Sequence, residues 1–441
     1  MSNTSLPENS STETTVPEVN ASGLFRTYVG HLRLFSRNIW LYLGMLFLLN
    51  LNLQIFLTMF NLYMKAMGFA EGDVGQAIAS RQAGAAFFAI PIAILMSKVS
   101  MKRVLTVACL LLAIASFALV HTSSNTLIMI FSFMCGVSFS AAGIASGPFF
   151  MDNTSPTERA HVFSMSFGVH LIAGIIGSIS SGYIVAYFAS ALGDQVSGYR
   201  TTFYLTVISA VLAIIPLSVI RMTRVKAESA LGAFQWRGFF VRMKTQMKIL
   251  SAHFLVATGA GLSIPFINLY FAQRFNLSPG EIGTLFGLMQ IFMLAGTLSS
   301  PFMAIKWGLV RSIVFTQLIS IPFLLILANG QILGLAIVAF FLRAGFMNSA
   351  VPIIGTLGME VSRPEDRPMM QALVSTVWGA AWMISALVGG HLIESHGYAI
   401  TMDITVILYA IATGLFYVMF RELEKRTTTG SPQWVFVDEE A

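Results

Sequence analysis

The sequence is built from long apolar stretches that contain almost no charged residues. About 20 mostly apolar residues cross a bilayer as a helix, and the chain contains twelve stretches of this kind. Because every backbone polar group inside a membrane needs a partner, only helices and closed barrels span it. We therefore predict an all-α integral membrane protein. The predicted transmembrane helices span 39–65, 74–96, 104–121, 125–150, 160–188, 200–220, 248–272, 281–304, 311–328, 332–358, 368–394 and 399–420.

The composition excludes the soluble classes of protein. Hydrophobic residues make up 56% of the 441 residues and charged residues only 10%, whereas soluble proteins carry about 25% charged residues. The chain is thus neither a soluble enzyme nor a secreted scaffold, and its two cysteines, Cys109 and Cys135, both lie in apolar stretches. The net charge of +6 does not indicate a nucleic-acid partner, because basic residues of membrane proteins gather in cytoplasmic loops.

The positions of the basic residues predict the topology. With the N-terminus in the cytoplasm, 21 of the 26 Lys and Arg residues fall on segments at the cytoplasmic face. Lys65, Arg200 and Arg274 fall near the outer face, and Arg81 and Arg343 fall within spans. This bias follows the positive-inside rule. We expect a multi-pass protein of the cell (plasma or inner) membrane, surrounded by lipid, with both termini cytoplasmic.

Five segments follow from this topology. They are a cytoplasmic tail with a short amphipathic helix at 1–38, a six-helix bundle at 39–221, a cytoplasmic linker at 222–247, a second six-helix bundle at 248–421 and a cytoplasmic tail at 422–441. Residues 1–23 are rich in Ser, Thr, Glu and Pro and have no apolar core. This composition is typical of a disordered tail and differs from that of a signal peptide.

The two halves of the chain repeat one another. A shift of 207 or 208 residues aligns the same residue types at several places. The aligned segments are Gly72-Asp73-Val74-Gly75 with Gly280-Glu281-Ile282-Gly283, Gly182 with Gly390, and Asn61-Leu62-Tyr63 with Asn268-Leu269-Tyr270. Six spans return the chain to the side where it began, so the halves have the same orientation. Parallel repeats of this kind are related by an axis along the membrane normal, and they move against each other around a site near the midplane.

This arrangement resembles the major facilitator superfamily over residues 39–421. That family has a signature between spans two and three, in which a Gly precedes an Asp and several cations. The corresponding segments run from Ser97 to Arg103 and from Ile305 to Arg311; they keep cations but replace the Asp by Ser97 and Ile305. The resemblance implies two pseudo-symmetric six-helix bundles that transport a small-molecule substrate by alternating access. We expect a monomer.

A gate is expected at the cytoplasmic ends of the spans. The candidate gate residues are Lys98, Arg103, Asp152, Arg159, Glu360 and Arg367. Because the signature Asp is missing, the latch between Asp and Arg that the family implies is either absent or built from Asp152 and Glu360 instead.

Charged side chains inside spans are candidates for function, because a charge at the bilayer centre costs about 2.5–3.5 kcal/mol on insertion scales. Arg343 lies near the middle of the tenth span. It either has a substrate or coupling role or is a structural partner for helix carbonyls. Arg81, in the second span, lies nearer the outer surface, where it either has such a role or snorkels. With no carboxylate predicted mid-span, two arginines favour an anionic or zwitterionic solute.

Other polar and aromatic positions predict the walls of a solute cavity. Asn50, Gln54 and Asn61 share one helical face of the first span, which either lines the cavity or forms packing hydrogen bonds. The remaining cavity candidates are Asn268, Gln290, Trp378 and Trp382. The two tryptophans either form the floor of an amphipathic pocket or fill the core. His170 is the central candidate for proton coupling, with a hydrogen bond to a neighbouring helix as the alternative role.

These features predict a secondary active transporter of a small organic solute that is anionic, zwitterionic or amphipathic, with proton coupling left open. A multidrug or metabolite efflux antiporter is one alternative, although Gly177 to Gly182 lack the Pro and one Gly of the family's antiporter motif. A non-transporting membrane receptor or regulator is an alternative of a different class. The sequence has no catalytic, metal-ligand or nucleotide-binding motif, so we expect neither an enzyme nor a cofactor.

Overall fold

The fold is taken from a computed structural model that describes residues 35–221, 244–360, 362 and 367–427. The regular elements among these residues are all helical. The first half contains α2 (Arg37–Ala66), α3 (Glu71–Lys98), α4 (Met101–His121), α5 (Asn125–Asn153), α6 (Pro156–Leu192), α7 (Gln195–Leu212) and α8 (Ile214–Val219). The second half contains α10 (Lys244–Ser263), η1 (Ile264–Phe266), α11 (Ile267–Phe275), α12 (Pro279–Trp307), α13 (Leu309–Asn329), α14 (Leu333–Glu360), α15 (Arg367–His396) and α16 (Tyr398–Thr427).

The helices confirm the predicted twelve spans. Their ends differ from the predicted ends by a few residues, because most helices continue past the apolar stretch into polar sequence. Two spans are broken. The sixth is divided into α7 and α8, next to Pro216, and the seventh is interrupted by the 3-10 turn η1, which contains Pro265. Proline lacks a backbone N–H and interrupts the helical hydrogen-bond ladder, which explains both breaks.

Several predicted segments lie outside the described residues. They are the tail and most of the predicted amphipathic helix at 1–38, most of the linker at 222–247 and most of the tail at 422–441.

The repeat seen in the sequence is also a repeat of helices. The first residues of α3, α4 and α5 are each 208 positions before the first residues of α12, α13 and α14. A hydrogen bond recurs as well: Tyr63 donates to the carbonyl of Val120 at 2.9 Å, and Tyr270 donates to the carbonyl of Leu327 at 2.6 Å. The two halves are therefore built on one pattern of helices.

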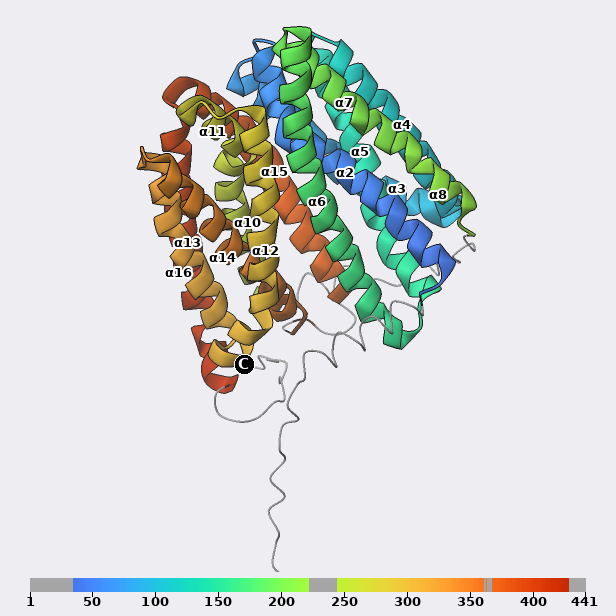
Figure 1. The fold of residues 1–441 in the computed structure, drawn as a ribbon. Helices are drawn as coiled ribbons and strands as arrows, with labels where there is room; N and C mark the ends of the chain where they lie inside the picture. Colours follow the sequence, from blue (N-terminus) through green and yellow to red (C-terminus); the bar gives the residue numbers. More distant parts are fainter. Residues whose placement is uncertain (1–34, 222–243, 361, 363–366, 428–441) are drawn as a thin grey trace, which may run out of the picture.

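The halves form two bundles that lie side by side, α2 to α8 in one and α10 to α16 in the other (Figure 1). We name the two ends of the molecule by their connections. The basic end carries the connections at 98–101, 153–156 and 307–309, and the closed end carries those at 66–71, 192–195 and 275–279. In Figure 1 the bundles adjoin at the closed end and spread apart toward the basic end.

Contact between the bundles is made mainly by two pairs of helices, α3 with α15 and α6 with α12, and α2 also contacts α11 and α12. Spans one and seven are the most buried, with 61% and 72% of their most apolar segments inside the protein. These two spans occupy corresponding places in the two repeats. The pseudo-symmetry axis therefore runs between α2 and the span formed by α10, η1 and α11.

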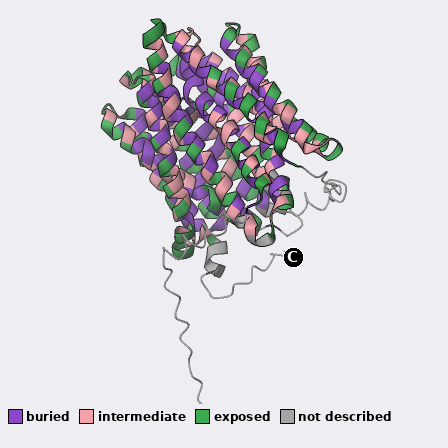
Figure 2. Cartoon of the chain, turned by 45° about the vertical axis from the view of Figure 1, so that its right-hand side comes forward, coloured by how far each residue is buried: buried purple, intermediate pink, exposed green. Residues whose placement is uncertain are grey.

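The outer surface of the helices is apolar. Exposed residues follow the outside of the bundles in Figure 2, and they include Phe87, Phe302 and Ile305, which are 66%, 76% and 86% exposed. Exposed apolar surface on this scale is costly in water and is normal in a lipid bilayer. The chain is thus a multi-pass membrane protein.

Candidate functional site

Two asparagines join the bundles at the closed end, directly on the pseudo-symmetry axis. The side chain of Asn61 donates to the carbonyl of Pro265 at 2.6 Å, and that of Asn268 donates to the carbonyl of Thr58 at 2.9 Å. A further bond runs from Asn61 Nδ2 to Asn268 Oδ1 at 3.0 Å. Asn61 corresponds to Asn268 in the repeat, and Thr58 corresponds to Pro265. We call this reciprocal set of bonds the amide clasp.

Glycine seams flank the amide clasp on both sides, where α3 meets α15 and α6 meets α12. A Cβ built on Gly75 would lie 3.1 Å from Cα of Gly390, and a Cβ built on Gly283 would lie 3.1 Å from Cα of Gly182. These two contacts are repeats of each other. At each seam the backbones touch, so that a side chain at these glycines would push the bundles apart.

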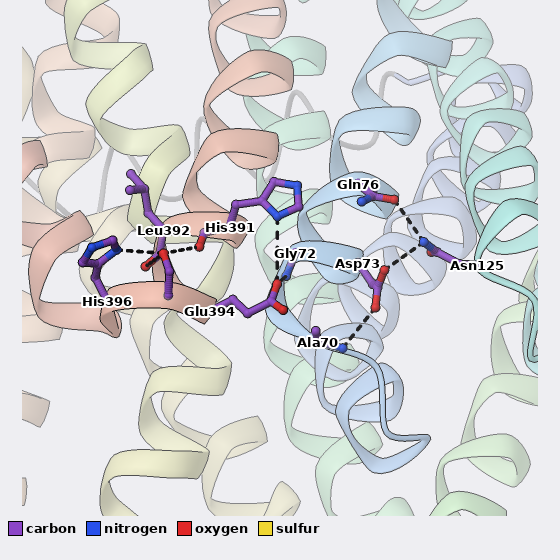
Figure 3. A network of polar contacts seen from close by, with 10 residues as sticks. Ala70, Gly72, Asp73, Gln76, Asn125, His391, Leu392, Glu394 and His396 are labelled. Atoms are coloured by element: carbon purple, nitrogen blue, oxygen red, sulfur yellow. Dashed lines mark hydrogen bonds and ion pairs between the residues drawn. The ribbon is translucent and has the colours of Figure 1, made fainter.

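The seam between α3 and α15 also carries charged groups (Figure 3). Glu394 accepts a hydrogen bond from the backbone N–H of Gly72 at 3.2 Å, and His391 Nδ1 lies 3.9 Å from the same carboxylate oxygen. Asp73 accepts from the N–H of Ala70 at 3.1 Å and from the side chain of Asn125 at 2.8 Å. The first turn of α3 is therefore capped partly by a carboxylate of the other bundle, which its exposed N–H groups favour.

A second polar contact lies beside this seam. Glu71 pairs with Lys65 at 2.9 Å and accepts a hydrogen bond from Gln273 of the other bundle at 2.9 Å. At the seam between α6 and α12, by contrast, Thr284 donates a long hydrogen bond of 3.4 Å to the hydroxyl of Tyr183. The two seams have the same backbone packing but different side-chain chemistry.

The predicted gate at the basic end is not assembled in this structure. Lys98, Arg103 and Asp152 are exposed, and within the described part of the chain none of the three forms an ion pair. Arg159 donates to the carbonyl of Met151 at 3.5 Å. One carboxylate oxygen of Glu360 is buried without a hydrogen-bond partner. The side chain of Arg367 lies outside the described residues, so the role of this gate stays a prediction.

Arg343 lies inside the second bundle, where it is 5% exposed. Its guanidinium donates to the hydroxyl of Tyr409 at 3.1 Å and lies 5.9 Å from the centre of the Tyr409 ring. Its Nε is buried and has no hydrogen-bond partner among the residues that the structure describes. If Arg343 has a structural role, the partner predicted from the sequence is a helix carbonyl. The structure instead gives a tyrosine hydroxyl as the partner. Within the described part of the chain, other hydrogen-bond donors of Arg343 stay free for a further acceptor.

Arg81 lies inside the first bundle, near the position that corresponds to Arg343 in the repeat. Its guanidinium lies 5.4 Å from the centre of the Phe56 ring, and no described residue forms a hydrogen bond with its buried Nε. Cys135 is close enough to interact with it electrostatically. The position that corresponds to Cys135 in the repeat is Arg343, and the one that corresponds to Arg81 is Met289. Each bundle therefore has one arginine and one sulfur-containing residue at these two positions. In the first bundle the arginine is on α3 and the sulfur on α5, whereas in the second bundle the sulfur is on α12, which corresponds to α3, and the arginine on α14, which corresponds to α5.

The amide side chains on one face of the first span, those of Asn50, Gln54 and Asn61, contact different partners. Asn50 donates to the carbonyl of Leu46 at 2.8 Å, and its Oδ1 lies 2.8 Å from His170 Nδ1. A hydrogen bond from His170 to a neighbouring helix was the alternative role predicted for this residue, and the bond to Asn50 on α2 is of this kind. The proton-coupling role of His170 stays a prediction.

Two predicted glutamines pack against glycines of α6. Gln54 is buried next to Gly177 of its own bundle, and Gln290 reaches across from the other bundle to Gly174. The Oε1 atom of Gln290 is buried without a partner. Both glutamines therefore belong to the polar interior, at the depth where α6 meets α12.

The two tryptophans of α15 lie in the interior of the second bundle. Trp378 and Trp382 stack with ring centroids 5.7 Å apart, and the ring of His253 lies 5.1 Å from that of Trp378. They pack on a small apolar cluster that includes Tyr409. The Nε1–H of Trp382 is buried, and the described part of the chain offers it no acceptor. This placement agrees with core filling, and it also leaves one donor for a ligand.

Sequence analysis missed several residues that the structure brings to these sites. Tyr409, His253 and Glu394 are isolated residues in apolar or terminal sequence, and no motif marked them. Their partners are distant in the chain, so spacing alone gives no signal. The repeat marked the neighbouring glycines Gly72 and Gly390 as recurring positions, but it gave no sign that Glu394 lies beside them.

The fold and the polar interior together define a class: a membrane protein of two pseudo-symmetric six-helix bundles that meet around an interior lined with polar and cationic groups. The family model of the Major Facilitator Superfamily matches residues 42–243 and 249–436. The chain belongs to this superfamily, and it is accordingly a transporter for a small-molecule substrate and not an enzyme.

Solved structures of transporters share the fold at low sequence identity. A bacterial homologue of the human lysosomal transporter Spinster, in an inward-facing and unoccupied conformation, matches with a TM-score of 0.74 and 14% identity over 90% of this chain and 99% of its own. The nucleoside transporter NupG matches with a TM-score of 0.72 and 15% identity over 87% and 100%. A bacterial homologue of the iron transporter ferroportin, inward-facing, matches with a TM-score of 0.71 and 15% identity over 87% and 98%. No curated protein sequence matches significantly.

Proposed function

We propose that this chain is a secondary active transporter of a small organic anion or zwitterion, amphipathic solutes included. The observation that carries the proposal is the pair of interior guanidinium groups, Arg81 and Arg343, each with unfilled hydrogen-bond donors. Every Asp and Glu in the described part of the chain lies near a helix end. Among the described residues, the interior cations therefore have no carboxylate as a counter-ion, and a substrate is the natural source of one.

The chemistry of arginine supports this substrate class. A guanidinium presents a planar fork of donors that matches a carboxylate or a phosphate, and a buried cation without a partner is expensive in a membrane. Phe56 beside Arg81, and Tyr409 near the stacked Trp378 and Trp382, add apolar surface to both cationic positions. Two of the structural neighbours are named by unrelated cargoes, a nucleoside transporter and a homologue of an iron transporter, so they do not select among solutes.

The proposal includes an orientation and a state. The basic end faces the cytoplasm, because 21 of the 26 cations in the sequence fall on that side. The bundles meet at the closed end, which then faces outward, and this corresponds to an inward-facing state. Two of the structural neighbours are described as inward-facing, which agrees with this assignment. Transport would proceed as the closed end opens and the basic end closes, with Asp152 and Glu360 among the candidates for the basic-end gate.

The test is binding followed by transport. Purified protein is screened by thermal shift against monocarboxylates, dicarboxylates, phosphate monoesters and neutral analogues of the same size. The strongest ligand is then used for uptake into proteoliposomes. We expect Arg343→Gln to weaken binding of that anion at least ten-fold and Arg343→Lys to weaken it less. Arg200→Gln is the matched control, because Arg200 lies near the end of the span and its Nε contacts the hydroxyl of Tyr63.

The outcomes separate the candidate functions. Full transport of the anion by Arg343→Gln, or stabilisation by neutral analogues alone, would contradict the anion proposal. Binding without uptake in either direction would favour the receptor or regulator. Export of the solute driven by an inward proton gradient would identify the efflux antiporter. An imposed proton gradient also tests whether transport is coupled to protons, for which His170 is the proposed group.

A further inference from the structure

Asn50 on α2 and His170 on α6 form one hydrogen-bonded pair in the interior of the first bundle. The distance from His170 Nδ1 to Asn50 Oδ1 is 2.8 Å, and Asn50 Nδ2 lies 2.8 Å from the carbonyl oxygen of Leu46. His170 also stacks on Phe167, with ring centroids 6.4 Å apart. Neither partner of the pair is near a helix end.

The direction of each bond follows from the chemistry of its atoms. The carbonyl of Leu46 can only accept, so the Asn50 atom facing it is the amide nitrogen. The other amide atom of Asn50 is then the oxygen, which can only accept as well. His170 Nδ1 must therefore carry a hydrogen, and in the neutral imidazole the lone pair lies on Nε2.

Nε2 of His170 is left free by this arrangement. It has no hydrogen-bond partner among the residues that the structure describes, and it does not belong to the fully buried polar atoms. A neutral imidazole with a free, accessible Nε2 is a proton acceptor whose other nitrogen is already occupied.

We propose that Asn50 is a positioning residue that fixes His170 in the Nδ1–H tautomer, so that Nε2 is the atom that takes up the proton during transport. This inference rests on the proposed function, in its proton-coupled form. The Nε2 lone pair binds a proton delivered by water, the imidazole becomes an imidazolium, and Asn50 Oδ1 keeps its hydrogen bond throughout. Release to water on the other side reverses the step.

No fixed charge of the neighbouring helices competes for this position. The helices packed against α6 are α2, α5, α7 and α12. Their charged residues, all near helix ends, are Arg37 and Lys65 on α2, Asp152 on α5, Arg200 on α7, and Glu281 and Lys306 on α12. The charged residues of α6 itself are Glu158 and Arg159, at its basic end, next to His161. The other titratable groups of α6 and the helices packed against it are Tyr42, Tyr63, Cys135, Tyr183, Tyr187, Tyr199 and Tyr204. No hydrogen bond between described residues joins any of these groups to His170.

The tautomer can be measured without knowing the substrate. The full-length protein is labelled with ¹⁵N-histidine and reconstituted in lipid nanodiscs, and the His170 signals are identified by their loss in His170→Gln. Long-range ¹H–¹⁵N spectra then report which ring nitrogen carries the hydrogen. We expect the Nδ1–H tautomer in the wild type, whereas the Nε2–H tautomer in the wild type would overturn the proposal.

Variants of Asn50 test the positioning role. Asn50→Leu removes the acceptor and is expected to shift His170 toward the Nε2–H tautomer, whereas Asn50→Asp keeps an acceptor and is expected to retain Nδ1–H. Gln54→Leu is the matched control one turn away, because the Gln54 side chain makes no hydrogen bond with a described residue. Retention of the Nδ1–H tautomer in Asn50→Leu would show that Asn50 does not set it.

The proton role is tested separately from the transport function. With the anion identified by the thermal-shift screen as the probe, proton-driven uptake is expected to be lost in His170→Gln, while exchange of the anion without a gradient is retained. In Asn50→Asp the pH at which uptake is half-maximal is expected to rise by about one unit, because the carboxylate favours the imidazolium. Uptake that is independent of a proton gradient in the wild type would overturn proton uptake at Nε2 and leave anion transport standing. Loss of all anion binding would instead refute the proposed function.

Discussion

The closed end and the basic end of this transporter differ in how the bundles are held. At the closed end the bundles are joined by the amide clasp, by backbone contact at the glycine seams and by the carboxylate of Glu394 on the first turn of α3. At the basic end the predicted gate residues Lys98, Arg103 and Asp152 are exposed and unpaired among the described residues. The contacts that hold the two bundles together in this structure are therefore concentrated at the closed end.

The closed end accounts for part of the repeat that is visible in the sequence. The clasp asparagines and the seam glycines recur in both halves, and a contact on a two-fold axis uses the same residue type from both sides. Basic-end residues recur as well, such as Lys98 with Lys306. Inside a bundle, where each half packs with itself, the residue types differ at positions such as Arg81 and Met289.

The largest effect is expected from filling a glycine seam. Gly75→Val places a side chain against the carbonyl of Ala386 and the Cα of Gly390, and backbone atoms cannot rotate away as a flexible side chain can. We expect the closed end to be destabilised by about 3 kcal/mol. Spin labels at Leu192→Cys and Ile332→Cys measure the separation across this end, since the native cysteines are both buried.

The control for this variant is Gly379→Val on α15, where an added Cβ would meet nothing within 4 Å. An unchanged distance distribution in Gly75→Val would show that the seam does not hold the closed end together.

A smaller effect is expected from breaking the amide clasp. Asn61→Leu removes the donor to Pro265 and leaves that carbonyl without its partner, at a cost of about 1–2 kcal/mol. Because Asn61 also bonds to Asn268, the effects of Asn61→Leu and Asn268→Leu should not add. The same spin-label distances measure both variants and their combination. Asn329→Leu is the control, since its amide donates to the carbonyl of Leu325 in its own helix; strict additivity of the two clasp variants would argue against a shared contact.

A weaker effect is expected from neutralising the charged cap of α3. Glu394→Gln keeps an acceptor for the N–H of Gly72 but loses the attraction between a negative charge and a helix N-terminus, worth about 0.3–1 kcal/mol. The closed-end population should fall slightly, and its dependence on salt should weaken. A salt dependence equal to that of the wild type would assign the effect to another charge, such as Glu71.

The smallest effect is expected at the basic end. Asp152→Asn and Glu360→Gln should shift the closed-end population by no more than about 0.5 kcal/mol, because neither carboxylate forms an ion pair with a described residue. If these residues form the basic-end gate, the same variants should reduce uptake in proteoliposomes. A large change in the closed-end distance would break the contrast between the two ends.

The twelve spans, the two bundles and the superfamily were predictable from the sequence, because the length of an apolar stretch is a local property that a bilayer reads directly. The breaks at Pro216 and Pro265 were equally visible as prolines, although the sequence does not tell whether a proline kinks a helix or divides it. The repeat predicted corresponding positions, but it could not tell which of them touch.

The polar interior was predicted less completely. Arg343 and His170 were identified because charge and titratable groups are rare in apolar sequence. Their partners, Tyr409 and Asn50, lie on helices far away in the chain, and only the fold brings them together. Asn61 was predicted either to line the cavity or to form packing hydrogen bonds, and Asn268 to line the cavity. The structure places both in the contact between the bundles. The chemistry of a side chain limits what it can bind, while its location decides what it does bind.

The amide clasp makes the closed end an isologous interface within a single chain. In a homodimer, one substitution changes both sides of such an interface at once; here the two sides are encoded separately and can change one at a time. A conservative change at Asn61 therefore creates a mismatch that a second change at Asn268 can repair. The closed end should tolerate paired substitutions that neither half tolerates alone, which offers a way to set the balance between the two states of the transporter without altering its interior.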